Sequence, residues 1–379
     1  MKIIKKFRKS EKGSITVMVL AVMLFLIGVI TVSYFAMSNK SIEQNKKVSQ
    51  IAKQYKTSDE DMEKEYQKAI NNLKVEDYVK VGDYVDYNPT IASKDGTKVE
   101  ESKLSYTSPI GTATEHGNGN SEQTFKATED TKWRVLNVEK DGSIELISEN
   151  AIKTDLKTNF IIEFTIGYLY AEQELNEACK IFGYGYGADT TKGGSYTVGG
   201  PLDTPVTGKI EETGARSMTI EDINKIIGVY EENNKIKDSD GKVIEDTYGN
   251  TNNPTVGVYY PTIDTEKGNT NGLSNKTEAK NLKATYYSYN FSKLGIDIVN
   301  GNNWLASRCI SAGSDRVTCG VRCIEGSLIS EKDVFYGSSD SFGNSTHLDN
   351  VGIRPIITLK SNIIDINTDY NKEKKWKLK

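Results

Sequence analysis

The longest apolar segment of the chain runs from Ile15 to Met37 and has no charged residue among its 23 positions. A helix of this length, rising about 1.5 Å per residue, would cross the roughly 30 Å hydrocarbon layer of a bilayer with some tilt. We therefore predict a transmembrane helix at 15–37. A buried core helix and a cleaved secretory signal are the alternatives, although the apolar region of a signal usually spans only about 7–15 residues.

Charge is distributed unevenly around this segment. The first 13 residues hold six Lys or Arg and one Glu, a sum of +5, which leaves −9 for the rest of a chain whose formal charge is −4. Because short basic flanks stay in the cytoplasm, we predict a cytoplasmic leader at 1–14 and an extracellular location for everything beyond the membrane helix. The acidic body argues against a nucleic-acid partner, which would require clustered Lys and Arg.

A Lys12-Gly13 pair stands directly before the apolar segment. This layout resembles the prepilin-type leader of type IV pilins and pseudopilins, which is cut after the glycine on the cytoplasmic side. The resemblance makes Gly13 the expected processing site. Pilins usually carry Glu at the fifth position after the cut, where this chain has Met18. Because that carboxylate pairs with the new amino terminus of a neighbouring subunit, the resemblance implies membrane anchoring and leaves assembly with other pilin-like subunits open.

Residues 38–77 predict a helical stalk. Val48, Ile51 and Tyr55 recur at helical spacing on one side, and a second helix is expected to begin near Thr57. A polar helix with one thin apolar stripe packs on a following domain, pairs with another copy or serves as a solvated spacer.

From Tyr78 onward, short runs of alternating apolar and polar residues predict strands. The clearest strands are expected at 133–138, 143–148, 304–310, 317–324, 334–336 and 353–359. The first two should form a hairpin around Asp141-Gly142, and the next two a second antiparallel pair. Pro355 should lie at a sheet edge or at the start of a strand, because proline cannot donate to the ladder.

Two helices are expected among these strands. The segment 166–185 places Leu169, Leu175 and Cys179 on one face, so Cys179 is interpreted first as a small core residue. A second helix should begin after Thr219, whose hydroxyl suits an N-cap. The sequence therefore predicts an α+β fold class.

The four cysteines are few for a disulfide-built protein, so the fold must depend on a hydrophobic core. If the second hairpin turns across 312–315, Cys309 lies opposite Thr318 or Cys319. That register permits a Cys309–Cys319 disulfide, with Cys309–Cys323 as its rival.

The spacing of residues gives little support for a zinc, phosphate or calcium site. A zinc site would need His116 or His347 as a fourth ligand, and their spacing matches no familiar zinc module. The glycine-rich segment 183–194 lacks the Gly-Lys-Ser/Thr ending of a phosphate loop. The acidic residues around Asp240-Gly241 lack the twelve-residue calcium pattern and predict a turn instead. We predict no catalytic residue, no metal and no cofactor.

A series of short motifs spans residues 78–366. In chain order they are Lys-Trp-Arg-Val-Leu at 132–136, Leu-Ile-Ser at 146–148, Ala-Arg-Ser at 215–217, Trp-Leu-Ala-Ser-Arg at 304–308, Gly-Val-Arg at 320–322, Gly-Ser at 326–327 and Val-Gly-Ile-Arg-Pro at 351–355. The series is similar to an uncharacterised domain of Gram-positive surface and secreted proteins, which looks related to the C-type-lectin-like fold of formylglycine-generating enzymes. The resemblance implies a twisted antiparallel sheet with long loops, and binding more readily than catalysis. Residues 367–379 are then a basic C-terminal tail or a last strand.

Several residues of these motifs have an expected structural role. Trp133 and Trp304 should lie in the core. Arg308, Arg322 and Arg354 stand beside apolar neighbours and should pair with Asp, Glu or backbone carbonyls. A site for an acidic ligand is the alternative.

The sequence thus predicts a noncatalytic, single-pass cell-surface protein that presents a lectin-like recognition or adhesion domain to a glycan or protein ligand. A ligand-binding loop is expected around Tyr336, Asp340, Phe342 and His347, because Tyr supplies rigid amphipathic contact area. An ordinary solvated loop is the alternative. Two other functions stay open: a minor pilin or pseudopilin subunit, and an enzyme related to formylglycine-generating oxidases.

Overall fold

The computed structural model describes most of the chain beyond residue 73. The described residues are 74–109, 123–154, 160–162, 164–200, 204–232, 235–243, 257–260, 275–278, 289–292, 297–312, 316–338, 342–343, 351–365 and 370–379. The chain divides into two units, Met1–Lys74 and Val75–Lys379, and the described elements belong to the second. Gly13, the apolar segment and the stalk up to residue 73 lie outside the described residues. Of the helices in the described part, none is both long and apolar enough to cross a bilayer.

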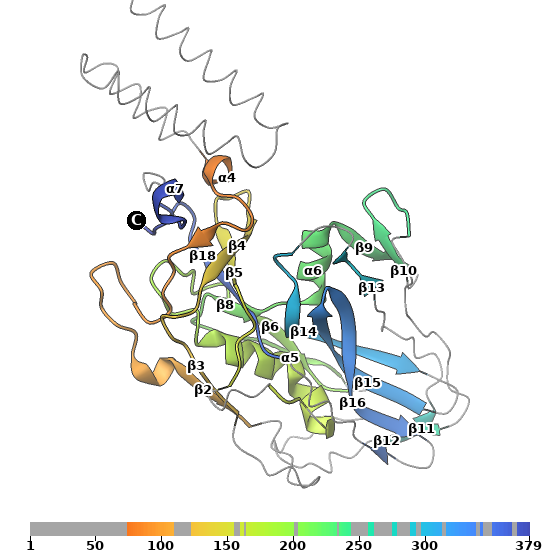
Figure 1. Ribbon diagram of the computed structural model, residues 1–379. Coiled ribbons are helices and arrows are strands. Elements are labelled where there is room, and N and C mark those ends of the chain that lie inside the picture. The colour runs from red at the N-terminus through yellow and green to blue at the C-terminus, as the bar shows by residue number, and fades with distance from the viewer. Residues whose placement is uncertain are drawn as a thin grey trace, which may run out of the picture. The chain divides into compact units, whose positions relative to one another are not determined.

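The second unit combines helices with a larger number of strands, which confirms the predicted α+β class (Figure 1). Its helices are α4 (Val75–Tyr78), the 3-10 helix η2 (Glu101–Lys103), α5 (Phe164–Lys180), α6 (Ile220–Ile227) and α7 (Tyr370–Glu373). Two-stranded antiparallel pairs are formed by β2 (Ser105–Ser108) with β3 (Gln123–Lys126), β6 (Ser195–Val198) with β7 (Val206–Lys209), β9 (Val229–Glu232) with β10 (Lys235–Asp238), and β11 (Gly257–Tyr260) with β12 (Asn275–Glu278).

The first large sheet is antiparallel throughout. Its order is β1 (Tyr84–Val85), β4 (Trp133–Val138), β5 (Ile144–Ser148), β18 (Pro355–Leu359) and β8 (Ala215–Ser217). The predicted β4–β5 hairpin is confirmed, and Gly142 supplies the positive φ of 81° that its turn requires. Strand β18 lies between β5 and β8 and is buried along its whole length. Pro355 is its first residue, which confirms the expected place at the start of a strand.

The second large sheet contains the three longest strands described. Its order is β13 (Tyr289–Asn290), β16 (Leu328–Ser338), β15 (Arg316–Gly326) and β14 (Gly301–Ala312), with β17 (Phe342–Gly343) also paired to β16. The predicted antiparallel pairing of the two segments around Trp304 and Val321 is confirmed as β14–β15. A register shift interrupts this pairing between Trp304 and Arg308, and another interrupts β15–β16 between Cys319 and Gly320.

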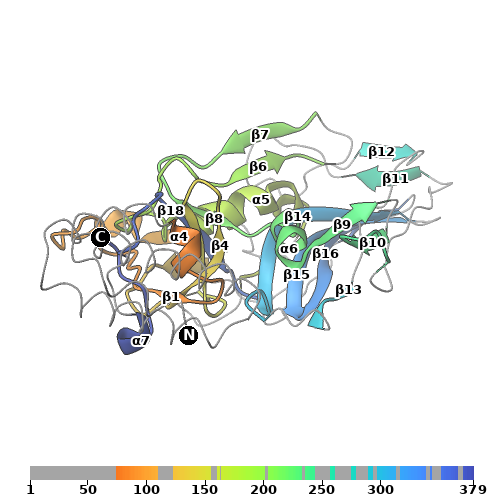
Figure 2. The same ribbon diagram turned by 90° about the horizontal axis from the view of Figure 1, so that it is seen from above.

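Helix α5 contacts both sheets, through β8 of the first and β14 of the second. Figure 2 shows the β6–β7 hairpin on one side of α5 and β14 on the other. The predicted apolar face is confirmed, because Leu169, Leu175 and Cys179 are all buried. They share one core with Trp133 and Trp304, each only 1% exposed. Since full burial of one large apolar side chain stabilises by about 1.5–3 kcal/mol, this shared core holds the two sheets and α5 together.

Helix α6 follows β8 after a short cap. Thr219 is the predicted N-cap, and its hydroxyl accepts a hydrogen bond from the Asp222 amide while the Asp222 carboxylate accepts one from the Thr219 amide at 2.8 Å. Gly228 ends the helix in the left-handed conformation at φ 71°. The apolar face of α6 enters a second core, which includes Ile223, Leu305 and other residues of both large sheets.

The C-terminal residues pack on the start of the unit. Trp376 forms a bridge with Val85, stacks on Tyr370 and donates its indole N–H to Asp83 at 2.9 Å. Leu378 forms a second bridge with Ile364. Trp376 and Leu378 thus form isolated bridges after the short helix α7.

Candidate functional site

The four residues of the expected binding loop are only partly described. Asp340 and His347 lie outside the described residues, as does His116. Tyr336 is half-buried on β16 opposite Thr318, and Phe342 belongs to β17. The part of the loop that the structure describes is thus sheet, and the binding role of these four residues stays a prediction.

The cysteines are free thiols, and all four are buried. The expected register is wrong by at least one residue, since Cys309 lies opposite Gly320 while Cys319 lies opposite Ile310. Alternate strand residues point to opposite faces, so Cys309 projects from the face opposite to Cys319 and Cys323. Neither the Cys309–Cys319 disulfide nor its rival with Cys323 is formed.

Burial also determines the protonation of these thiols. It raises the pKa of Cys309 to about 12 and the pKa of the other three above their ordinary value. Because the thiolate is the reactive form, these cysteines are weak nucleophiles at neutral pH.

Arg354 is a structural residue, as the pattern of its motif predicted. Its guanidinium is 2% exposed and donates to the backbone carbonyls of Ser148 at 2.8 and 3.1 Å, Ile298 at 3.0 Å and Asn300 at 2.8 Å. These carbonyls belong to the end of β5 and to the segment before β14, so one side chain ties the two large sheets together. Desolvation by burial lowers the pKa of Arg354 to about 10. The group stays protonated at neutral pH.

The presence of glycine at position 352 of the same motif is also explained by the structure. A Cβ on Gly352 would stand 2.7 Å from the carbonyl oxygen of Ile152. The backbones approach closely because Ile152 and Ile353 form a β-bridge at this point. The Gly-Ile-Arg-Pro run therefore encodes a close backbone contact, a carbonyl clamp and the start of β18.

Arg308 confirms the expectation of structural pairing as well. Its Nε lies 3.4 Å from Glu172, its Nη1 donates to the carbonyls of Tyr168, Leu169 and Gly199, and its guanidinium carbon stands 5.0 Å from the centre of the Tyr168 ring. These contacts join β14 to α5. The guanidinium is thereby occupied by the protein itself.

Arg322 is 4% exposed and stands opposite Glu331 in the β15–β16 register. Desolvation by burial is the main cause that raises the pKa of Glu331 to about 8, and the nearby charge of Asp333 adds to it, while the charge of Arg322 opposes it. Glu331 is therefore a carboxyl group that titrates near neutral pH inside the sheet.

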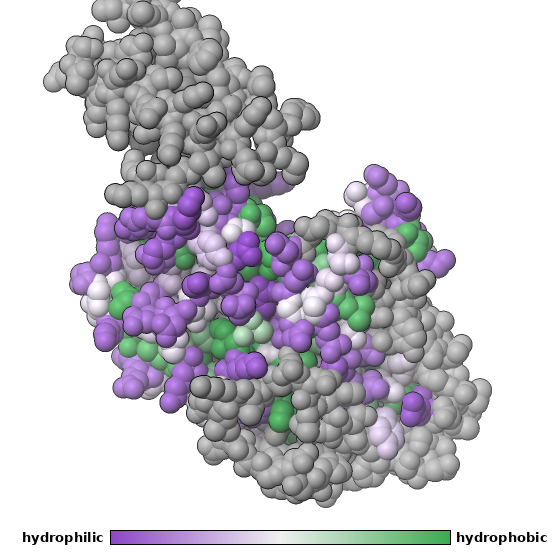
Figure 3. Space-filling model, viewed as in Figure 1, coloured by the Kyte–Doolittle hydropathy of each residue, from purple (hydrophilic) through white to green (hydrophobic). Residues whose placement is uncertain are grey.

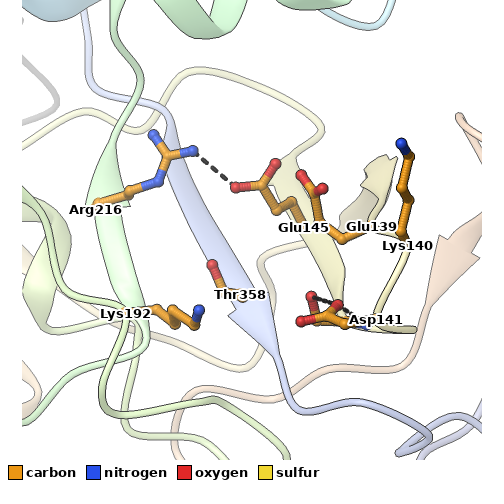
Figure 4. Close-up of a pocket in the computed structure, with 8 residues that line it drawn as sticks. Glu139, Lys140, Asp141, Glu145, Lys192, Arg216 and Thr358 are labelled. Atoms are coloured by element: carbon orange, nitrogen blue, oxygen red, sulfur yellow. Dashed lines mark hydrogen bonds and ion pairs between the residues drawn. The ribbon is translucent and has the colours of Figure 1, made fainter.

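A polar surface pocket of about 600 Å³ opens over the first sheet. It is lined by Glu139, Lys140, Asp141, Ser143, Glu145, Lys192, Arg216 and Thr358 (Figure 4). These residues come from the β4–β5 hairpin, the loop after α5, β8 and β18. Six of its eight lining residues are charged, which makes it the candidate site.

Arg216 organises one side of this pocket. Its two terminal nitrogens donate to both oxygens of Asp222, at 2.5 and 2.8 Å, and Nη2 also donates to Glu145 at 2.8 Å. Burial alone would lower the pKa of Arg216, but the hydrogen bonds and charge of Asp222 and then of Glu145 raise it above its ordinary value. The guanidinium therefore stays charged and fixes the Glu145 carboxylate on the pocket wall.

The acidic side of the pocket is held by a second set of contacts. Asn137 donates to Glu139 at 2.5 Å and to Glu145 at 3.3 Å. The ammonium of Lys225 binds Glu139 at 2.7 Å, and this hydrogen bond raises the pKa of Lys225. Two carboxylates thus stand side by side with fixed orientations.

Asp141 and Thr358 complete the lining. Asp141 accepts from the Ser143 amide at 2.9 Å and from its hydroxyl at 2.6 Å; the hydroxyl is the main cause that lowers the pKa of Asp141, and the charge of Lys192 contributes. Thr358 is 6% exposed, its amide donates to Gly214 at 2.9 Å, and its hydroxyl points into the pocket (Figure 4). The floor is therefore a rigid strand with one polar group.

Little in the sequence could have revealed this pocket. Arg216 was noted as part of a motif and Asp141 as a turn residue, but no local pattern joins them. The one usable signal is the Thr219 cap, because Asp222 in the first turn of α6 lies within reach of an arginine at the end of the preceding strand.

No family model matches the chain, and searches of curated proteins and of solved structures found no significant match.

Proposed function

We propose that the chain is a noncatalytic, membrane-anchored cell-surface protein whose Val75–Lys379 unit recognises a polar ligand through the pocket over the first sheet. The observation that carries the proposal is the fixed array of charge around Arg216, which holds Glu145 and Asp222 at 2.5–2.8 Å. Oriented charged groups on a rigid scaffold suit recognition, because little ordering entropy is lost on binding.

The character of the surface supports a polar rather than an apolar ligand. Large hydrophobic side chains exposed on the described residues are Val81, Val206, Tyr230 and Val243. In Figure 3 hydrophilic residues dominate the described part of the visible face, with hydrophobic residues scattered between them. A contiguous apolar patch of several hundred Å² would be typical of a protein-docking face instead.

The finer fold assignment and the location belong to the same proposal. The C-type-lectin-like arrangement is supported by the order of the motifs, and by the clamp that Arg354 forms between two antiparallel sheets. The membrane anchor is supported by the uncharged segment Ile15–Met37 behind a basic leader.

The enzymatic alternative receives less support from the site. An oxidase related to formylglycine-generating enzymes would need a reactive thiol pair in a pocket. Cys309 points to the face opposite to Cys319 and Cys323, and burial raises the pKa of all three. The four cysteines described here are therefore better explained as core residues.

The recognition function is tested by screening the full chain, purified in detergent micelles, against an array of glycans and short peptides. We expect at least one ligand that the wild type retains and Arg216→Met loses. Lys360→Gln, an exposed lysine outside the pocket, serves as the matched control and should bind as the wild type does. Equal retention by all three proteins, or no ligand for the wild type, would contradict the proposal.

A minor pilin or pseudopilin role is the second candidate, favoured by the Lys12-Gly13 pair before the apolar segment. Mass spectrometry of the mature protein distinguishes the two. A new amino terminus at Ser14 would favour the pilin-type role, whereas an intact Met1 would favour simple anchoring.

A further inference from the structure

The pocket over the first sheet has walls of opposite charge. Figure 4 shows Arg216 and Lys192 on one side and Glu139, Glu145, Asp141 and Lys140 on the other, with Thr358 between them on the floor. A ligand that fills this space therefore meets positive charge at one end and mainly negative charge at the other.

The lining of the pocket is neutral as a whole. Glu139, Asp141 and Glu145 supply three negative charges, and Lys140, Lys192 and Arg216 supply three positive ones. A ligand that carries one charge of each sign, with no net charge, matches this balance. Its ammonium group can join Glu139 and Glu145, which Asn137 holds side by side.

The opposite wall offers a cation without a direct ion pair to the described residues, although its charge acts on Asp141 and Asp189. Arg216 directs its terminal nitrogens to Asp222, Glu145 and a backbone carbonyl, so few of its donors are left for a ligand. Lys192 is exposed, and its ammonium forms no ion pair with the described residues. Thr358 lines the same pocket as Lys192 (Figure 4). A carboxylate could accept hydrogen bonds from both groups.

From this arrangement we propose that the pocket binds a small zwitterion of the peptide class, with its ammonium group against Glu139 and Glu145 and its carboxylate against Lys192 and Thr358. This inference rests on the proposed recognition function and names its ligand class. A volume of about 600 Å³ accommodates a dipeptide or tripeptide, within the range of roughly 300–1,000 Å³ usual for small-molecule sites.

The test is a calorimetric titration of the full chain in detergent micelles with alanyl-alanine, N-acetyl-alanyl-alanine and alanyl-alanine amide. The dipeptide should bind, and each capped form should bind at least tenfold more weakly, because one removes the ammonium and the other the carboxylate. Equal affinity for the three peptides, or no binding of the dipeptide, would overturn the inference.

Single substitutions test which wall of the pocket binds each end of the ligand. Lys192→Gln should weaken the dipeptide at least tenfold and abolish the discrimination between the free acid and the amide. The control Lys360→Gln, outside the pocket lining, should leave the affinity unchanged. Thermal unfolding of each variant verifies that the fold is kept. Loss of discrimination in Lys360→Gln but not in Lys192→Gln would contradict the assignment.

A neutral disaccharide, maltose, separates this inference from the function on which it rests. Binding of maltose without binding of the dipeptide would overturn the zwitterion class and leave recognition of a polar ligand supported. Failure of both probes would overturn the zwitterion class alone, since the recognition function is decided by the wider screen with Arg216→Met.

Discussion

Two arginines close to neighbouring strands of one sheet perform opposite tasks. Arg354 on the segment leading into β18 donates to neutral backbone carbonyls in the interior, whereas Arg216 on β8 donates to two carboxylates at the edge of a pocket. Burial lowers the pKa of Arg354 to about 10, while the two acids hold that of Arg216 above its ordinary value. The first region uses a guanidinium as a structural clamp and the second uses it to orient charge toward solvent.

The comparison shows that the role of an arginine in a motif depends on the groups that accept its hydrogen bonds and not on its neighbours in the sequence. Carbonyl acceptors satisfy the donors but add no charge, so a buried clamp can bind nothing further. Carboxylate acceptors leave a charged surface behind, which a ligand can use. Substitutions in the two regions should therefore affect different measurements.

The largest effect is expected at the clamp. Arg354→Met leaves several buried carbonyls without a donor, each costing on the order of 1–3 kcal/mol, so we expect a loss of about 4 kcal/mol in the free energy of unfolding. Urea unfolding followed by tryptophan fluorescence measures it. Arg354→Lys retains a charge but fewer donors and should lose about half as much. A loss below about 1 kcal/mol for Arg354→Met would show that the carbonyls have other partners.

Glu331 extends the comparison to a buried acid. Its titration should make the free energy of unfolding depend on pH. Its ordinary pKa of 4.5 is raised to about 8 in the folded protein, so between these values the folded state holds a proton that the unfolded chain has released. Stability contributed by this group is then full below pH 4.5, falls by on the order of 1 kcal/mol per pH unit as the pH rises, and is constant above pH 8. The difference in unfolding free energy between wild type and Glu331→Gln should follow this course, and a flat difference between pH 5 and 8 would contradict it.

A close backbone contact next to the clamp gives a smaller effect. Gly352→Ala places a Cβ 2.7 Å from the Ile152 carbonyl oxygen, which the β-bridge at this point cannot easily relieve. We expect a loss of about 2 kcal/mol, in the range usual for overpacking. Gly326→Ala is the matched control for added volume, because a Cβ there has open space and meets only the strain of a positive φ of 62°. Equal stability of Gly352→Ala and wild type would refute the steric account.

The smallest effect on stability is expected at the pocket. Arg216 has a side chain that is 19% exposed, so its ion pairs are partly screened and Arg216→Met should cost only about 1–2 kcal/mol. The same change releases Glu145 from its fixed position and should weaken ligand binding at least tenfold. Thermal unfolding measures the stability, and titration with alanyl-alanine measures the affinity. If Arg216→Met bound the dipeptide as tightly as the wild type, Arg216 would have no role in binding.

Local features of the fold could be predicted from the sequence. The β4–β5 hairpin, helix α5 and the Thr219 cap each depend on residues within one element, and all three are confirmed. The register of β14–β15 was missed because the pairing nearest the turn joins Ala312 to Val317, whereas the expected turn at 312–315 includes Ala312, and an error of one residue moves a cysteine to the opposite face.

The pocket could not be predicted because β18 joins it from far along the chain. Strand β18 pairs with β5 and β8 in the sheet but is more than 130 residues from either along the chain. No local sequence pattern therefore predicts this pairing. The acceptors of Arg354 were equally hidden, since backbone carbonyls carry no residue-type signal. The membrane segment, the processing site Gly13 and the loop around Asp340 and His347 stay predictions, because they lie outside the described residues.

The most direct test measures unfolding free energy and dipeptide affinity in parallel for Arg354→Lys and Arg216→Lys. We predict that Arg354→Lys lowers stability by about 2 kcal/mol and leaves the affinity of the folded protein unchanged, whereas Arg216→Lys weakens binding at least tenfold with a stability loss of about 1 kcal/mol. If both variants changed stability and affinity together, the separation between a structural clamp and a recognition site would be wrong.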